Sequence, residues 1–182
     1  MTEKHIMLDT ETLGVEYDAV ILSVCIVEFN PRTGRTFDIL NIQHINVNQS
    51  IRAGHKVEPD TLAWWVDNGI QRIVDTQRYD YHPSIEQVHQ FLNQRTNFPL
   101  WGKSPWFDLE KLKYAFRLNN LSVPWHHHNI HDLRTLLNIT NPEALSGITG
   151  NAGKHIALHD CLHQINQLCC VLKYLGNTTT YH

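Results

Sequence analysis

The stretch from Ala19 to Phe29 reads AVILSVCIVEF and limits the folds open to this chain more than any other segment. It is rich in β-branched residues and almost free of charge, which is typical of a strand at the centre of a sheet. The apolar segment Lys4 to Leu8 predicts a strand before it. The turn at Asn30 to Gly34 leads into a third strand, predicted over Arg35 to Val47. Three strands joined this closely predict an antiparallel meander.

Helical patterns dominate the rest of the chain and are interrupted by short apolar strands. Helices are predicted over Asp60 to Asn68, from Ser84 as an N-cap, over Asp108 to Asn119 and over Leu158 to Leu175, and short strands over Phe98 to Trp101 and Asn129 to His131. A meander followed by alternating helices and strands, with a long final helix, predicts an α/β layer arrangement around a mixed sheet.

The length and composition fit one folded domain. The chain has 182 residues, of which 18% are charged, and no apolar run approaches the roughly 20 residues that span a membrane. The N-terminus lacks a secretory pattern, and the four cysteines form no CxxC pair, which fits the reducing cytosol. We therefore expect a cytoplasmic protein with a single domain over residues 1–176 and a short tail at 177–182.

The formal net charge of -3 narrows the classes of function. Proteins that coat nucleic acid by electrostatic attraction are usually basic, so this charge argues against that class. It is compatible with an enzyme that holds one strand end through a few contacts and through bound metal ions. Such ions would cancel several acidic side chains locally.

Two acidic residues, Asp9 and Glu11, stand at the end of the first predicted strand. Residues i and i+2 of a strand point to the same side, so their carboxylates would repel each other unless a cation lay between them. Hard cations such as Mg²⁺ prefer oxygen ligands of this kind. The alternative is an exposed acidic strand end that leads into the turn at Gly14.

Two later acids have similar alternatives. Asp108 follows a short strand and a Gly/Pro loop and opens a helix, a position that aims a side chain into a cleft or simply caps the helix. Asp160 shares with Gln164 the helix face opposite the apolar residues, which alone would indicate a solvated face. His155 precedes Asp160 by five residues, and a neutral imidazole there could accept a proton from an attacking water.

Together these residues resemble the DEDDh exonucleases of the DnaQ-like group. That group carries Asp-x-Glu at the end of the first strand, an Asp that opens a middle helix, and His-x4-Asp near the C-terminus. The matching residues here are Asp9, Glu11, Asp108, His155 and Asp160. The resemblance covers roughly residues 5–175 and implies a ribonuclease H-like three-layer α/β fold, with a mixed sheet flanked by helices.

Two further segments resemble a small-subunit branch of that group from bacteria and phages. They are Thr61 to Trp65 and Trp101 to Pro105. The chain departs from the group's pattern at Cys161, where alanine is more usual, and at His159, which is a rival imidazole beside the expected base. The His-x4-Asp spacing selects His155.

The resemblance implies a 3'-5' exonuclease that uses two Mg²⁺ or Mn²⁺ ions and acts on the 3' end of DNA or RNA. Asp9 would bridge both ions, and Glu11 and Asp160 would complete the site of the ion that activates water. Asp108 would serve the second ion. His155 would take the proton from the water, and the product would be a nucleoside 5'-monophosphate.

Candidate substrate contacts come from the same segments. They are Thr10, Thr12, Leu13, Trp65, Trp106 and Lys103. The main chain near Thr12 and Leu13 would hold the terminal 3'-hydroxyl and base. Trp106, Trp64 or Trp65 would stack on an unpaired base, although at least one of the adjacent pair is expected in the core. Lys103 and Lys154 could contact phosphate or could be ordinary surface lysines.

Two rival functions remain open from the sequence. His155, His159 and His163 recur at helical spacing and could form a zinc site, although the motif HExxH is absent. A non-catalytic nucleic-acid-binding module of the same fold is the second rival. The sequence leaves open the choice between DNA and RNA, and between single strands and overhangs. Exposed aromatic residues near Trp64 could also form a homodimer surface.

Overall fold

The computed structural model describes residues 3–70, 77–145, 148 and 155–178. Five strands form one sheet: β1 (His5–Thr12), β2 (Ile21–Phe29), β3 (Thr36–Ile42), β4 (Leu100–Gly102) and β5 (Ile130–Asp132). Their order across the sheet is β3-β2-β1-β4-β5. The first three strands are antiparallel neighbours, which confirms the predicted meander. Because β4 runs parallel to β1 and β5 parallel to β4, the sheet is mixed, as predicted.

Helices connect and cover the strands. They are α1 (Val47–Ala53), α2 (Pro59–Asp67), α4 (Tyr81–Asn93), α5 (Pro105–Leu118), α6 (Leu133–Ile139) and α7 (Ala157–Thr178), with 3-10 turns at His127–Asn129 and Pro142–Leu145. The long final helix was predicted to end at Leu175 and continues through Thr178. In the part of the chain that the structure describes, no helix combines the length and the apolar character needed to cross a bilayer.

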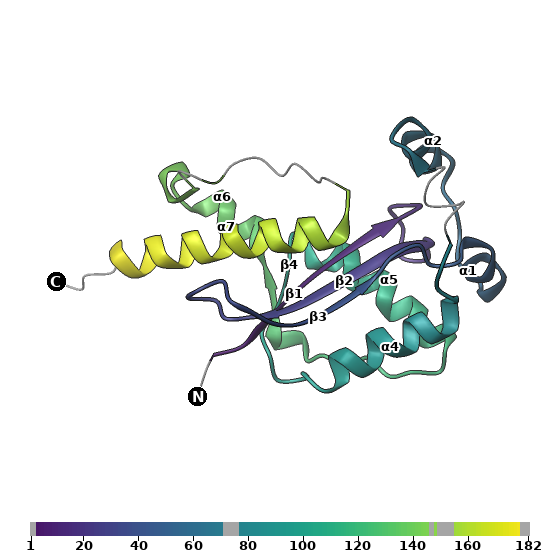
Figure 1. Ribbon diagram of the computed structural model, residues 1–182, viewed down its shortest axis with the longest axis horizontal. Helices are drawn as coiled ribbons and strands as arrows, with labels where there is room; N and C mark the ends of the chain where they lie inside the picture. Colours follow the sequence, from purple (N-terminus) through teal and green to yellow (C-terminus); the bar gives the residue numbers. More distant parts are fainter. Residues whose placement is uncertain (1–2, 71–76, 146–147, 149–154, 179–182) are drawn as a thin grey trace.

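Helices lie on both faces of the sheet, so the molecule has three layers (Figure 1). The alternation of β1 explains the arrangement, because successive side chains of a strand point to opposite faces. Ile6 and Leu8 belong to the core beneath α4 and α5, whereas Met7 packs in the core beneath α7. β2 is buried along its whole length, because both of its faces are covered. Its place between β3 and β1 confirms the interior position in the sheet expected from its composition.

The third strand is shorter than predicted. It ends at Ile42 rather than Val47, because His44 takes a left-handed backbone conformation with φ 61° that interrupts the strand. Asn46 then caps α1, accepting a hydrogen bond from the backbone N–H of Gln49 at 3.0 Å.

The helix predicted from Ser84 begins earlier, at Tyr81, with Asp80 as its N-cap. Gln49 accounts for the difference, since its side-chain oxygen accepts a hydrogen bond from the Tyr81 N–H at 2.8 Å. A side chain remote in sequence therefore accepts a hydrogen bond from a backbone N–H in the first turn of the helix. The hydroxyl of Ser84 lies inside the helix and donates to the Asp80 carbonyl at 2.6 Å.

Candidate active site

The structure brings together three of the four predicted metal ligands. Asp9 and Glu11 lie on β1 and Asp160 lies in the first turn of α7, and their carboxylate oxygens are within 4.8 Å of one another. Asp9 and Glu11 point to the same side of β1 as Met7, which faces α7. The α7 helix therefore places Asp160 directly over the end of the strand that carries the other two acids.

Cys161 explains how α7 comes so close to the sheet. Its side chain is fully buried, and its sulfur lies 3.8 Å from the carbonyl oxygen of Met7 and 3.5 Å from that of Cys25. A small residue is needed where a helix contacts the main chain of two strands. The departure from alanine at Cys161 therefore preserves the packing that positions Asp160.

Gln164 is a site residue that the helical pattern alone would place on a solvated face. It shares the face of α7 that carries Asp160, but it is buried rather than solvated. Its side-chain N–H donates to Asp9 Oδ1 at 2.8 Å. The polar face of α7 covers the end of β1, so Gln164 on this face contacts the acidic site instead of solvent.

Asp108 approaches from the other layer. The helix α5 begins at Pro105 with Ser104 as its N-cap, three residues before the predicted start, and Asp108 lies in its first turn as expected. It is also buried, and Ser104 rather than Asp108 occupies the N-cap position, so Asp108 is not the residue that caps the helix. Its Oδ1 accepts hydrogen bonds from the N–H and the hydroxyl of Thr10, at 3.0 and 2.6 Å. Thr10 thus holds Asp108 against the strand that carries Asp9 and Glu11.

Burial and mutual repulsion raise the pKa values of these acids. The pKa of Asp9 lies well above its ordinary value, because of burial first and then the charges of Asp108 and Glu11. Burial and the nearby carboxylates of Asp160 and Asp108 raise the pKa of Glu11 to about 8. Burial raises the pKa of Asp108 to about 7, although the two hydrogen bonds from Thr10 oppose the shift.

The donor set fits a hard divalent cation. Every converging ligand atom of Asp9, Glu11 and Asp160 is a carboxylate oxygen, the ligand type that Mg²⁺ and Mn²⁺ prefer. Several buried carboxylates in one place are unfavourable when all are ionised, and positive charge between them would relieve that repulsion. The chemistry of the residues present is therefore suited to the predicted ions.

His155 lies beside Asp160 through its main chain. Its backbone is left-handed, with φ 64°, and its N–H donates to Asp160 Oδ2 at 3.0 Å. Its exposed imidazole packs edge-on against Trp64, with ring centroids 4.6 Å apart. The predicted adjacency of the histidine and the acid is thus present, and the contact with Trp64 is an addition. Lys154 lies outside the described residues.

The predicted substrate residues divide into supporting and exposed groups. Trp65 is only 4% exposed, and its indole N–H donates to the Thr12 carbonyl at 2.8 Å. It packs with Leu13 in a small core, so the structure does not support its predicted stacking role. Leu13 is itself buried, and its main-chain N–H donates to the carbonyl of Val20 at 2.8 Å. Of the adjacent Trp64 and Trp65, Trp64 therefore lies at the surface and Trp65 lies in a core.

The exposed candidates lie near the start of α5. Trp106 is 60% exposed in the first turn of α5, two positions before Asp108, and Lys103 is partly exposed in the preceding loop. The loop is shaped by Gly102, where a Cβ would lie 3.0 Å from Pro105, and by Ser104 with φ 75°. This bend places Trp106 at the surface while Asp108 turns inward.

Lys111 is a buried residue near the site that no sequence signal marked. It is buried among the apolar residues of α5, and burial lowers its pKa to about 8. Its ammonium group donates to the carbonyl oxygens of Val15, at 2.9 Å, and Phe107, at 3.2 Å. Lys111 therefore ties the loop that follows β1 to the helix that carries Asp108.

The structure does not support the zinc alternative. Among the described residues, the acidic triad is the group of at least three potential metal ligands whose atoms converge. His155, His159 and His163 are all described and do not form such a group, because His155 precedes α7 and turns toward Trp64.

Comparisons with known proteins agree with this geometry. The family model of the 3'-5' exoribonuclease Rv2179c-like domain matches residues 4–172. No curated protein matches the chain.

Solved structures of exonuclease I share the fold. One structure of exonuclease I has a TM-score of 0.74 and 11% identity, with 96% of this chain and 43% of that chain covered. The zinc-bound Escherichia coli exonuclease I complex with single-stranded DNA has a TM-score of 0.70 and 13% identity, with 97% and 43% covered. The enzyme from Methylocaldum szegediense has a TM-score of 0.71 and 14% identity, with 97% and 41% covered. The chain thus spans less than half of each relative, and the likeness confirms the ribonuclease H-like fold.

Proposed function

This chain belongs to the 3'-5' exoribonuclease Rv2179c-like domain family, and from that membership we propose that it removes nucleoside 5'-monophosphates stepwise from the 3' end of single-stranded or 3'-overhanging RNA. The family is one of enzymes, which argues against a non-catalytic binding module. The observation that carries the proposal is the convergence of Asp9, Glu11 and Asp160 within 4.8 Å, beside the buried Asp108.

Two Mg²⁺ or Mn²⁺ ions would be held by these acids, with Asp9, Glu11 and Asp160 at one position and Asp108 at the second. When bound, such ions activate a water molecule and stabilise charge on the attacking and leaving oxygens of an in-line displacement. The chain's own contribution is to fix the carboxylates. Gln164 orients Asp9 by donating a hydrogen bond to its Oδ1.

His155 is the proposed general base. Its main-chain hydrogen bond to Asp160 holds it beside the acids, and a ring nitrogen would accept the proton of the attacking water. The water oxygen then bonds to phosphorus, and the bond from phosphorus to the 3'-oxygen of the penultimate nucleotide breaks. That oxygen keeps the electron pair and takes a proton, which leaves a new 3'-hydroxyl on the shortened strand.

Substrate contacts are proposed for the surface next to the acids. Trp106 presents an exposed ring near Asp108 on which a base could stack, a contact worth about 1–3 kcal/mol per base. Lys103, in the adjacent loop, would contact phosphate. The relationship to exonuclease I, which has been crystallised with single-stranded DNA, supports nucleic acid as the partner. A homodimer through the exposed residues of α2 stays a prediction, which light scattering tests.

A degradation assay tests the function. RNA and DNA oligonucleotides of the same sequence, labelled at the 5' end, would be incubated with the protein and Mg²⁺ or Mn²⁺. We expect a ladder that shortens from the 3' end, faster for RNA. The variant Asp9→Asn should lose at least a hundredfold in rate, because it removes a charged metal ligand.

The matched control is Asp67→Asn, which changes an exposed acid at the end of α2 and should keep full activity. Absence of shortening by the wild-type protein would contradict the proposal. Equal activity of Asp9→Asn and Asp67→Asn would contradict the assignment of the site.

A further inference from the structure

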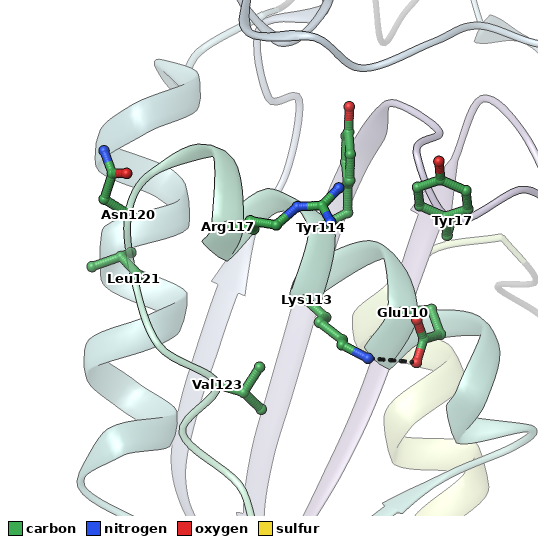
Figure 2. Close-up of a pocket in the computed structure, with 8 residues that line it drawn as sticks. All are labelled: Tyr17, Glu110, Lys113, Tyr114, Arg117, Asn120, Leu121 and Val123. Atoms are coloured by element: carbon green, nitrogen blue, oxygen red, sulfur yellow. Dashed lines mark hydrogen bonds and ion pairs between the residues drawn. The ribbon is translucent and has the colours of Figure 1, made fainter.

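A second concave site lies along the outer face of α5, apart from the acids. The cavity has a volume of about 690 Å³, within the range of roughly 300–1,000 Å³ that small-molecule sites occupy. It is lined by Tyr17, Glu110, Lys113, Tyr114, Arg117, Asn120, Leu121 and Val123 (Figure 2). Tyr17 comes from the loop between β1 and β2, and the other residues come from α5 and the segment after it.

Two aromatic rings form one end of this cavity. The rings of Tyr17 and Tyr114 meet edge to face with centroids 5.4 Å apart. Tyr114 is fixed, because its hydroxyl donates to the Gly54 carbonyl at 3.0 Å. Tyr17 is 51% exposed, so it presents a free ring beside a rigid one. Such a pair can accept a planar base.

Two cations lie on the same face of α5, one turn apart. The guanidinium of Arg117 lies 5.1 Å from the Tyr114 ring centroid, and Lys113 is exposed. Glu110 pairs with Lys113 at 3.4 Å, but the pair is exposed and therefore weak. Figure 2 shows Arg117 extending toward Tyr114, with Lys113 and Glu110 joined by a dashed line. Cations beside exposed aromatic rings are the combination that binds single-stranded nucleic acid.

The cavity is physically linked to the acidic site. Tyr17 belongs to the loop that directly follows the end of β1, and Lys111 holds that loop to α5 through the Val15 carbonyl. Asp108 and Arg117 are separated along α5 by roughly 13 Å, at about 1.5 Å per residue. Because Asp108 faces inward and Arg117 is exposed, this axial length is a minimum, and it corresponds to at least roughly four stacked nucleotides at about 3.4 Å each.

We propose that this cavity binds the single-stranded RNA a few nucleotides upstream of its 3' end. Tyr17 and Tyr114 receive a base, and Lys113 and Arg117 contact the flanking phosphates. The site adds binding contacts for longer strands, and short oligonucleotides do not reach these contacts. The inference rests on the proposed function, because the 3' end at the acids defines which nucleotides reach the cavity.

The decisive measurement compares strand lengths. Fluorescence anisotropy would give Kd values for twelve-nucleotide and three-nucleotide RNA on the Asp9→Asn protein. In that background, Lys113→Glu/Arg117→Glu should weaken binding of the longer RNA by about tenfold or more and leave the shorter RNA unchanged. The matched control is Arg32→Glu/Lys173→Glu, which makes the same charge change at exposed positions elsewhere. Equal weakening by both pairs, or by neither, would overturn the proposal.

Two single variants guard against a loss of folding. Tyr17→Ala changes an exposed loop residue and should also weaken only the longer RNA. Glu110→Gln should tighten binding of the longer RNA by about twofold, because it removes a like charge and releases Lys113. A gain in affinity cannot come from a misfolded protein. If Glu110→Gln weakens binding, the phosphate contact at Lys113 is wrong.

Two further arms separate the sources of the signal. A photoreactive 4-thiouridine placed about four nucleotides from the 3' end should cross-link to Tyr17 or Tyr114. A cross-link confined to residues outside the cavity would overturn the strand-binding proposal. RNA shortening by the wild-type protein, with no loss in any cavity variant, refutes the cavity and leaves the function standing. Loss of binding in the variants, with no shortening by the wild type, refutes the function and leaves the cavity standing.

Discussion

At the scale of single residues, the acidic site is defined by carboxylates that are unfavourable neighbours. Glu11 and Asp108 have pKa values raised to about 8 and about 7, and burial is the largest cause for both. A group with a raised folded-state pKa binds more protons in the folded than in the unfolded protein. Its favourable contribution is complete below the ordinary pKa and is lost as the pH rises through the folded-state value. The metal-free protein should therefore lose stability between about pH 4.5 and 8.

Thermal melts in the presence of a chelator test the expected fall in stability with rising pH. The midpoint should fall by several degrees between about pH 6 and pH 9, since roughly 1 kcal/mol corresponds to about 2–4 °C for a chain of this size. Mn²⁺ should restore the midpoint at the higher pH, because positive charge neutralises the acids. Glu11→Gln should flatten the pH dependence, whereas the exposed Glu86→Gln should leave it unchanged. A melting midpoint that rises with pH in the presence of the chelator would contradict this explanation of the pH dependence.

At the scale of elements, the distance between α7 and the sheet sets the geometry of the acids. Asp160 and Gln164 reach β1 only because Cys161 allows the helix to contact the strand main chain. On the opposite layer, Lys111 and Thr10 fix α5 against the loop after β1 and against the strand itself. The strand β1 carries Asp9 and Glu11, and the helices on its two faces carry the other acids, Asp160 on α7 and Asp108 on α5.

Substitution at Cys161 tests the contact of α7 with the sheet. Cys161→Leu should lower the free energy of unfolding by about 1–3 kcal/mol, the usual cost of overpacking, and should reduce RNA hydrolysis at least tenfold. Cys161→Ala is the matched control and should keep activity, because it stays small. Chemical denaturation and initial rates give the two quantities. Full activity of a folded Cys161→Leu protein would show that RNA hydrolysis does not depend on the close approach of α7 to β1.

At the scale of the whole molecule, a net charge of -3 coexists with substrate contacts that need positive charge. The described cations proposed for phosphate contact are Lys103, Lys113 and Arg117, so attraction to RNA comes from a few local side chains. Released counterions lower the affinity by about 0.7 in log Kd per phosphate contact for each tenfold rise in salt.

The salt dependence of binding is therefore expected to be shallow. Three contacts give a slope of about 2 in a plot of log Kd against log salt for twelve-nucleotide RNA. Lys113→Glu/Arg117→Glu should reduce that slope to about 1 or less, and Arg32→Glu/Lys173→Glu should preserve it. A wild-type slope of about 5 or more would indicate a far larger basic surface than the three side chains provide.

The meander and the long final helix could be predicted from the sequence, because each depends on local patterning that decides which side of an element a residue occupies. Local patterns left each acid with an ordinary alternative, and the resemblance to the DnaQ-like group selected Asp9, Glu11, Asp108 and Asp160, the first two of which converge with Asp160 in the structure. The same local patterns missed the start of α4, since the group that satisfies its first turn, Gln49, comes from another helix.

The contacts that these residues make depend on how the elements pack against one another. Gln164 lies on the polar face of its helix, and the sequence did not say which of Trp64 and Trp65 would enter the core. Packing of α7 places Gln164 against Asp9, and packing of α2 places Trp65 in a core. Lys111 carried no signal, because burial of a cation depends on carbonyl groups brought from a distant loop. Periodicity fixes the direction of a side chain relative to one helix or strand, whereas its burial and hydrogen bonding depend on which other element lies in that direction.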